Sequence, residues 1–328
     1  MQYNLQFHKL CERLYLGELL SKPVQLSGGL IHRMYAIETV SGKYAIKALN
    51  PQVMLRPNAM TDIVNGERIA AVAASYIPAL PAKQLNNSFV HEICGQYYLV
   101  YDWINGQSQF NENITPSHCA RIGEILGNLH SINFSHLDIP RPAVTTESIV
   151  DWDGYLLTGQ QNSAPWVSAL SGIANDIYNW NHRYLVSMKY LESPLVIGHG
   201  DIDPKNVLWC DGNPVVIDWE SAGFLNPFHE LIIYALYWSD QNGVIEKNKF
   251  EAFFNGYQSH VKLEKVDWRV VMDAGLSLHW LEYNIKRSLG IDCTDFAEQK
   301  MGTEQVYGTI EYLRRYEATI PQILMWLT

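Results

Sequence analysis

The residues of this chain best suited to chemistry lie between positions 199 and 220. Asp201 is followed by Asn206 five residues later, and Asp218 comes twelve residues after that. This combination fits phosphoryl transfer from a nucleotide, in which one carboxylate orients the attacking hydroxyl while an amide oxygen and a second carboxylate hold Mg²⁺ on the phosphates. We therefore expect Asp201 to act as the catalytic base, and Asn206 and Asp218 to bind the metal.

The spacing between these residues predicts a β-hairpin. Apolar runs at 207–209 and 214–217 flank Asp211-Gly212-Asn213, which is a strong tight-turn signal. Such a hairpin returns the chain on itself, so that Asn206 lies beside Asp218 and both side chains reach one metal ion.

This segment resembles the Brenner-type motif of the aminoglycoside phosphotransferase and choline kinase family, whose pattern is close to His-x-Asp-Leu-x-x-x-Asn followed by Ile-Asp-Trp or Ile-Asp-Phe. Here the two halves read His199–Asn206 and Ile217–Trp219, and the resemblance extends over about residues 26–238. It implies an α+β, bilobal protein-kinase-like fold. The amino-terminal lobe, 1–102, would hold a small antiparallel sheet with one helix, and the carboxy-terminal lobe, 103–328, would be larger and mainly helical. It also implies an enzyme that uses ATP, with GTP as the alternative, together with Mg²⁺.

The composition argues against several other classes of protein. The net charge of −10, with no basic run to offset it, argues against a nucleic-acid partner. No stretch approaches about eighteen consecutive apolar residues, so we expect no membrane span, and the amino terminus lacks a secretory signal pattern. The five cysteines are odd in number and scattered, which favours a reducing cytoplasm over a disulfide framework or a zinc site.

Periodicity and turn signals predict the elements that position the motif. We expect a helix near 5–20, strands at 24–26, 34–40 and 44–49, a helix over about 61–74, and strands at 88–93 and 97–103. Beyond Gly106 the pattern is helical almost throughout, with helical regions expected at 116–131, 163–191, 227–239, 266–289 and 303–327. The hinge between the lobes is expected near 102–106.

Two amino-lobe residues follow from the resemblance. Lys47, late in the third expected strand, takes the place of the lysine that contacts the α- and β-phosphates in kinase-like folds. Glu67, on the expected helix, would pair with Lys47 and hold it extended. We therefore count Lys47 and Glu67 with Asp201 as catalytic residues.

The loop expected to cover the phosphates contains Ser27, Gly28 and Gly29. Two glycines between strands let backbone amides approach phosphate oxygens closely. The loop is neither a Walker loop nor a full Gly-x-Gly-x-x-Gly, and an ordinary turn is the alternative.

The hinge is expected to bind the adenine ring. The resemblance places Tyr101 at the gatekeeper position, and the Asp102 carbonyl and Ile104 amide at the adenine edge. Leu208 would form the apolar floor of the pocket, with plain hairpin core as the alternative interpretation.

The motif also departs from the family pattern. Asp203 stands where relatives often carry histidine, and Lys205 stands where they often carry glycine. Lys205 would either bring a positive charge near the γ-phosphate or pair with Asp203. His199 and Gly200 are expected to shape the loop rather than to react, and Trp219-Glu220 after Asp218, in place of Phe-Gly, argues against a protein kinase.

The acceptor is expected to be a hydroxyl of a small molecule bound by the helical lobe, and the acidic chain is compatible with a cationic one. Segments 151–155, 237–240 and 279–283 combine carboxylates with aromatic rings, which suits amines and quaternary ammonium groups, although core packing competes as the role of their tryptophans. The family resemblance alone implies an aminoglycoside-type antibiotic as the leading acceptor, and choline, homoserine or a related alcohol is the alternative. A nucleotide-binding pseudokinase acting through a protein partner, and a scaffold without nucleotide, are the alternatives from other classes.

Overall fold

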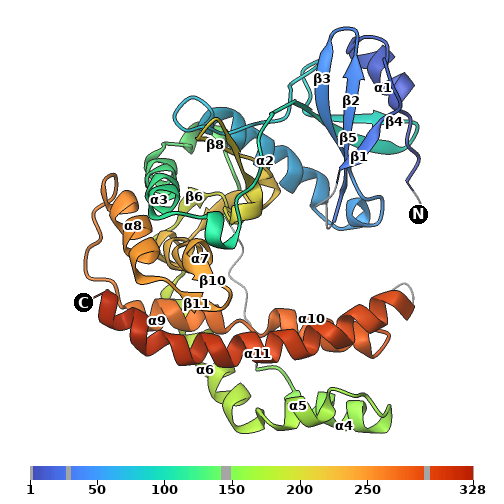
Figure 1. Ribbon diagram of the computed structural model, residues 1–328. Coiled ribbons are helices and arrows are strands. Elements are labelled where there is room, and N and C mark those ends of the chain that lie inside the picture. Colours follow the sequence, from blue (N-terminus) through green and yellow to red (C-terminus); the bar gives the residue numbers. More distant parts are fainter. Residues whose placement is uncertain (1–2, 27–30, 142–148, 292–295, 328) are drawn as a thin grey trace.

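The computed structural model describes residues 3–26, 31–141, 149–291 and 296–327. A small β-sheet lobe is joined to a larger helical lobe, which is the α+β, kinase-like arrangement expected from the sequence (Figure 1). The amino terminus lies on the sheet lobe and the carboxy terminus on the helical lobe.

The sheet lobe is built on five antiparallel strands in the order β1-β2-β3-β5-β4. Alternating apolar side chains give the sheet a buried face on which Tyr35, Ile37 and Ile46 pack against helix α1. The opposite face is also covered, with Leu99 and Tyr101 buried. The strands and this helix are β1 (Val24–Leu26), β2 (Arg33–Thr39), β3 (Gly42–Ala48), β4 (Val90–Ile93), β5 (Gln96–Asp102) and α1 (Phe7–Leu14).

Helix α2 (Ala59–Ala73) connects the sheet lobe to the motif. It packs against the 3₁₀ helix η5 (Trp219–Ser221), which directly follows Asp218. A Cβ at Gly66 would lie 2.3 Å from the Trp219 carbonyl oxygen, so glycine is required for this close approach. The close packing of α2 on η5 thus links the sheet lobe to the motif.

Among the described residues, the helical lobe contains three two-stranded sheets and the remaining helices. Strands β6 (Val196–Gly198) and β9 (Gly223–Leu225) pair antiparallel and enclose the motif, while β7 (Val207–Cys210) pairs with β8 (Asn213–Val216). Helix α11, the longest of the described helices, runs across the lobe beside α10, with α4 and α5 below it in the view (Figure 1). The helices and the small β10–β11 hairpin are α3 (Pro116–Ser131), α4 (Trp152–Gln161), α5 (Val167–Ser171), α6 (Ala174–Tyr190), α7 (Pro227–Ser239), β10 (Asp240–Gln241), β11 (Val244–Ile245), α8 (Lys247–Gln258), α9 (Trp268–Asp273), α10 (His279–Ser288) and α11 (Phe296–Trp326).

Helices α3 and α8 cross at very short range. Cβ atoms built at Gly123 and Gly256 would lie 2.0 Å and 2.1 Å from backbone oxygens of the opposite helix. Side chains there would separate the two backbones, so the glycines set the spacing of this part of the core.

The sheet lobe matches its predicted order closely, whereas the helical lobe differs in detail. The region expected to be helical over 163–191 is split into α5 and α6 by Gly172, and α4 lies before it. The region over 266–289 is likewise interrupted after α9. Helix α8 was missed, although Phe250, Phe253, Phe254 and Tyr257 follow helical spacing.

Candidate active site

The predicted hairpin forms and brings the proposed metal ligands together. Asp211 and Gly212 take positive φ values of 48° and 79°, which closes the tight turn between β7 and β8. The Ile217 amide then donates to the Asn206 carbonyl at 3.0 Å. Because Ile217 precedes Asp218, this bond places Asn206 beside the second carboxylate, as expected.

Asp201 lies in the segment 199–206, called here the catalytic loop. The Asn206 side-chain amide donates to both the backbone carbonyl and Oδ2 of Asp201, each at 2.8 Å. Burial raises the pKa of Asp201, as does the charge of Asp203, while Lys205 opposes the rise. The side chain is partly exposed, so a substrate hydroxyl can reach it.

One face of helix α7 holds the backbone of the catalytic loop. Glu230 Oε1 accepts from the Gly200 amide at 2.7 Å, the Tyr234 hydroxyl donates to the Gly200 carbonyl at 2.6 Å, and the Trp238 indole donates to the Ile202 carbonyl at 2.8 Å. These three side chains are spaced four residues apart and therefore share a helix face. The loop that carries Asp201 is thus attached to a buried helix at three points.

Glu230 is also tied to the core behind the loop. Its Oε2 accepts from His130 Nε2 at 2.6 Å, and His130 Nδ1 lies 2.9 Å from the Tyr257 hydroxyl. Burial alone would raise the pKa of Glu230, but the bonds to His130 and Gly200 outweigh it and lower that pKa. The buried carboxylate is therefore ionised and fully engaged.

His199 and Gly200 shape the loop. His199 is fully buried and accepts from the Asp201 amide at Nδ1 while Nε2 donates to the Ile217 carbonyl. Burial lowers the His199 pKa, so the ring is neutral. Gly200 has φ 76°, and a Cβ there would lie 2.4 Å from the Ser221 carbonyl oxygen. Both residues link the first half of the motif to the second.

Lys47 reaches across from β3 to the motif. Its ammonium lies 2.6 Å from Asp218 Oδ1 and 2.7 Å from Glu220 Oε2. Burial works against the charged lysine, but the two carboxylates more than offset it and raise the Lys47 pKa. The lysine is therefore charged and poised beside the proposed metal ligand.

The prediction that Lys47 forms an ion pair with Glu67 is wrong. Glu67 is buried on α2 and accepts from the Ala82 amide and, at 2.6 Å, from the Tyr101 hydroxyl. Burial raises the Glu67 pKa, while these two bonds and the more distant charge of Lys47 oppose the rise. The Glu67 carboxylate is thus engaged by Ala82 and Tyr101, while Lys47 pairs with Asp218 and Glu220.

The residues expected to cover the nucleotide are described only in part. Ser27, Gly28 and Gly29 lie outside the described residues. At the end of this loop, His32 donates from Nε2 to Glu220 Oε2 at 3.3 Å and accepts from the Asn50 amide at 2.9 Å. Glu220 thereby joins the loop, Lys47 and the motif.

The hinge passes directly over the hairpin. Asp102 ends β5, and its exposed side chain pairs with Lys83 at 2.6 Å. Ile104 is half-buried, and Gly106 packs against Leu208, with a Cβ expected only 3.2 Å from the Leu208 Cβ. The half-buried Leu208 thus lies beneath the hinge, where a floor for adenine was expected.

The donor set fits Mg²⁺. The Asn206 side-chain nitrogen donates to Asp201. Within the described ranges, no group donates a hydrogen bond to Asn206 Oδ1. Asp218 keeps its Oδ2 outside the Lys47 pair. Carboxylate and amide oxygens are hard ligands that Mg²⁺ accepts alongside water and phosphate. The described part of the chain contains no group of three His, Cys, Asp or Glu side chains arranged for a metal, so a bound ion would need nucleotide oxygens to complete its shell.

Lys205 pairs with two carboxylates of the catalytic loop. Its ammonium lies 2.6 Å from Asp203 Oδ2 and 3.2 Å from Asp201. Burial opposes the charged form, but the bonds to Asp203 and Asp201 raise the Lys205 pKa. Of the two roles considered from the sequence, the ion pair with Asp203 is formed.

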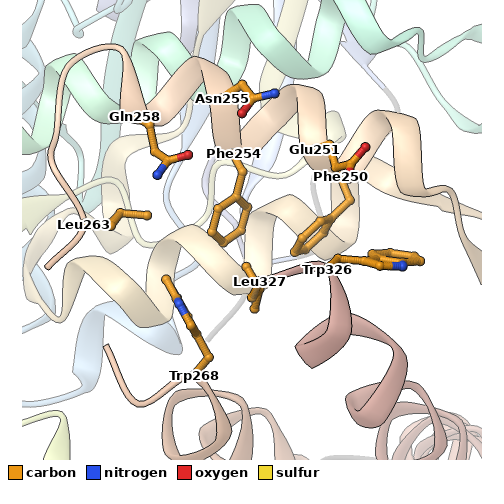
Figure 2. Close-up of a pocket in the computed structure, with 9 residues that line it drawn as sticks. All are labelled: Phe250, Glu251, Phe254, Asn255, Gln258, Leu263, Trp268, Trp326 and Leu327. Atoms are coloured by element: carbon orange, nitrogen blue, oxygen red, sulfur yellow. The ribbon is translucent and has the colours of Figure 1, made fainter. Parts of the chain in front are cut away.

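A pocket of about 380 Å³ opens beside these residues, and we call it the catalytic-loop pocket. Its lining combines charged, amide, aromatic and apolar side chains: Phe110, Asn111, Ile114, Asp203, Pro204, Lys205, Tyr237, Asp240 and Asn242. A second pocket of about 310 Å³ is lined by α8, the segment leading into α9 and the end of α11, with no residue from the motif (Figure 2). Position therefore favours the catalytic-loop pocket for an acceptor.

The three candidate cation-binding segments lie in different surroundings. Tyr237 and Asp240 line the catalytic-loop pocket. Trp152 is buried in the core, and Tyr155 donates to Glu282 at 2.8 Å, which joins the other two segments to each other.

Several residues of the site were not anticipated. Glu220 follows Asp218 by two positions, and His32 follows the glycine pair, so both were visible only as neighbours of expected residues. Glu230 carried a better signal, since it is a lone carboxylate in the otherwise apolar α7. Such a charge needs a buried partner, but the sequence does not reveal that the partner is Gly200.

No helix among the described residues is both long enough and apolar enough to cross a membrane.

Comparisons with known proteins agree with this fold. A model of the phosphotransferase enzyme family matches residues 23–264. A spectinomycin phosphotransferase solved with ADP and spectinomycin is similar in structure, with a TM-score of 0.68 and 13% identity over 96% of this chain and 99% of that one. An amicoumacin kinase solved with AMP-PNP and Ca²⁺ gives 0.64 at 13% identity, covering 97% and 93%. The choline kinase of Cryptosporidium parvum Iowa II gives 0.56 at 14% identity, covering 98% and 97%. At these identities the structures show a shared fold.

Proposed function

Since the chain belongs to the phosphotransferase enzyme family, we propose that it transfers the γ-phosphate of ATP, with Mg²⁺, to a hydroxyl group of a small molecule. The observation that carries this proposal is the convergence of Lys47 from the sheet lobe with Asp201, Asn206 and Asp218 from the helical lobe. Charge neutralisation, orientation of a hydroxyl and metal binding are thereby available at one place.

The roles follow from the loose transition state of phosphoryl transfer, in which the protein mainly aligns groups and neutralises charge. Lys47 would contact the α- and β-phosphates, supported by Glu220 on one side. Asp201 would accept a hydrogen bond from the acceptor hydroxyl and take its proton late in the reaction. Asn206 and Asp218 would hold Mg²⁺, which when bound neutralises developing charge on the phosphates.

The adenine would bind between the hinge and the hairpin. The main chain at Asp102 and Ile104 offers a carbonyl and an amide, and Leu208 offers an apolar floor. Ser27, Gly28 and Gly29 are proposed to cover the phosphates. The proposed nucleotide is therefore ATP. GTP is the alternative nucleotide, and the two should be compared in the assay.

The acceptor is proposed to enter the catalytic-loop pocket. Tyr237 and Asp240 offer an aromatic face and a carboxylate, which together suit an acceptor that carries an amine. The leading acceptor is an aminoglycoside-type antibiotic, and the similar folds of kinases named for spectinomycin and amicoumacin support that order. Choline-like alcohols remain the alternative, given the fold shared with a choline kinase.

We also propose a lobe boundary after Asp102 and a cytoplasmic location. The sheet ends at Asp102, and by Gln107 the chain is already paired with β7 of the helical lobe. Four cysteines within the described ranges, Cys11, Cys94, Cys119 and Cys210, are free thiols, which fits a reducing compartment.

The test is a coupled ADP-release assay with Mg·ATP against a mixed panel of aminoglycosides, other hydroxylated antibiotics, choline, ethanolamine, homoserine and simple sugars. Wild type would run beside Asp201→Asn and beside Asp211→Asn, an exposed change in the turn of the same hairpin. Release that depends on one acceptor, persists in Asp211→Asn and is lost in Asp201→Asn establishes the activity and names the acceptor class. Nucleotide binding with no release across the panel would instead favour a pseudokinase.

A further inference from the structure

Lys205 places a cation against the proposed catalytic base. Its ammonium is 3.2 Å from both Asp201 Oδ1 and Asp201 Oδ2, and 2.6 Å from Asp203 Oδ2. The Asn206 amide takes Asp201 Oδ2 as well, at 2.8 Å. Both oxygens of the base are therefore occupied by donors of the protein itself.

The position of Lys205 is fixed by its backbone. Asp203 Oδ1 accepts from the Lys205 amide at 2.9 Å, and the Ser108 hydroxyl donates to the Lys205 carbonyl at 3.0 Å. Asp203 thus holds both the backbone and the ammonium of the same residue. The ammonium is thereby directed at Asp203 and Asp201, while the side chain as a whole remains 43% exposed.

The ammonium also borders the catalytic-loop pocket. Lys205 and Asp203 line that pocket together with Tyr237 and Asp240. Lys205 therefore borders the pocket and also contacts Asp201.

We propose that Lys205 is a positioning residue that keeps Asp201 occupied until an acceptor hydroxyl displaces its ammonium, so that ATP is not hydrolysed in the absence of an acceptor. The proposal rests on the proposed function, since it concerns the same base and the same nucleotide. On displacement the ammonium keeps its shorter bond to Asp203, which makes the exchange local. A water molecule makes fewer contacts in a 380 Å³ pocket than an acceptor does, and so displaces the ammonium less readily.

The suppressed reaction is ordinary hydrolysis. A water oxygen would form a bond to the γ-phosphorus, the bond from that phosphorus to the bridging oxygen of ADP would break, and the water proton would pass to Asp201. The products are ADP and inorganic phosphate, and no further reactant is required. Without access to Asp201, the water loses its proton acceptor.

The experiment measures ADP release from Mg·ATP without any acceptor, comparing wild type with Lys205→Met. We expect Lys205→Met to raise this rate at least about tenfold, which is below the 10²–10⁴ that a positioned base contributes in full. The KM for ATP is expected to stay within about twofold, because Lys205 contacts the base and not the proposed nucleotide site. Lys205→Arg restores the cation and should return the rate toward that of wild type.

Further variants show whether the gain passes through Asp201. Lys205→Met combined with Asp201→Asn should fall back to the wild-type rate or below. Asp203→Asn loosens the ammonium but keeps an oxygen for the Lys205 amide, and it should raise hydrolysis less than Lys205→Met. Lys300→Met, an exposed change on α11, should leave the rate unchanged.

The outcomes separate this inference from the proposed function. Calorimetric titration with Mg·AMP-PNP shows whether wild type and each variant bind nucleotide, and circular dichroism shows that they are folded. If nucleotide binds and Lys205→Met hydrolyses ATP no faster than wild type, the inference is overturned while the kinase remains. If wild type binds no nucleotide, the proposed function fails and takes this inference with it.

Discussion

Replacement of Glu230 by glutamine tests whether helix α7 positions the catalytic loop. The carboxylate receives two short hydrogen bonds, from the Gly200 amide at 2.7 Å and from His130 at 2.6 Å, and its residue is 4% exposed. Glutamine keeps the shape of the side chain but offers one oxygen in place of two. One of the two donors must therefore face an NH₂ group.

The cost can be worked out from these contacts. A hydrogen bond to a charged group contributes about 1.5–3 kcal/mol, and a buried donor left unsatisfied costs about 1–3 kcal/mol. We therefore expect Glu230→Gln to lower the free energy of unfolding by about 2.5–6 kcal/mol, a range that includes the 3–5 kcal/mol found when a buried ion pair is broken by removing one partner. Because displaced catalytic groups lose rate steeply, acceptor-dependent kcat should fall on the order of 10²-fold.

The assay is urea unfolding followed by tryptophan fluorescence, together with ADP release. Glu251→Gln is the matched control, since Glu251 lies half-exposed and 3.4 Å from Lys247, and it should change the free energy of unfolding by less than about 0.5 kcal/mol. An unfolding midpoint and a kcat that both match wild type in Glu230→Gln would refute the anchoring role of α7.

Three further predictions concern other contacts of the chain. Gly123→Ala places a Cβ 2.0 Å from the Phe253 carbonyl oxygen and should destabilise the fold by about 1–3 kcal/mol or more. In Gly308→Ala the new Cβ meets nothing within 4 Å on α11, so this variant should stabilise the fold by about 0.5–1 kcal/mol. Thermal melts of both variants check these two expectations. Burial opposes ionisation of Glu220, but His32 and Lys47 lower its pKa from 4.5 to about 2. The ionised carboxylate therefore stabilises the fold at pH values above its pKa in the unfolded chain. This stabilisation is lost as the pH falls through the pKa in the folded protein. The advantage of wild type over Glu220→Gln in urea unfolding should accordingly shrink between about pH 5 and pH 2, and an advantage that stays constant over this range would contradict the assigned pKa. Lys47→Met should lower acceptor-dependent turnover on the order of 10²-fold, as when one preorganised donor to developing charge is removed. Steady-state kinetics that show near-normal turnover would exclude Lys47 from the phosphate site.

Local signals predicted the motif well. The turn at Asp211-Gly212 and its flanking apolar runs are short-range features, so the hairpin and the meeting of Asn206 with Asp218 could be foreseen from spacing alone. The strand register that delivers Lys47 was likewise visible in the order of turns and apolar runs.

Long-range contacts could not be predicted in the same way. Lys47 pairs with Asp218 and Glu220 across the two lobes, and the close approach of α2 to η5 beside them requires the absence of a side chain at Gly66. Glu67 was a reasonable partner on the helix, yet the actual partners come from the other lobe. Glu230 was visible as a charge in an apolar helix, but only the packing of α7 beneath the loop identifies Gly200 as its target.

The most direct test of the account follows the phosphorus atom itself. ³¹P NMR of wild type with Mg·ATP and the acceptor found in the panel should show loss of the γ-phosphate signal and growth of a phosphomonoester signal. That growth should require Mg²⁺ and slow by about 10²–10⁴ in Asp201→Asn. A phosphomonoester that forms equally fast in Asp201→Asn, or free phosphate as the sole product with every acceptor, would contradict the assignment of this site to phosphoryl transfer.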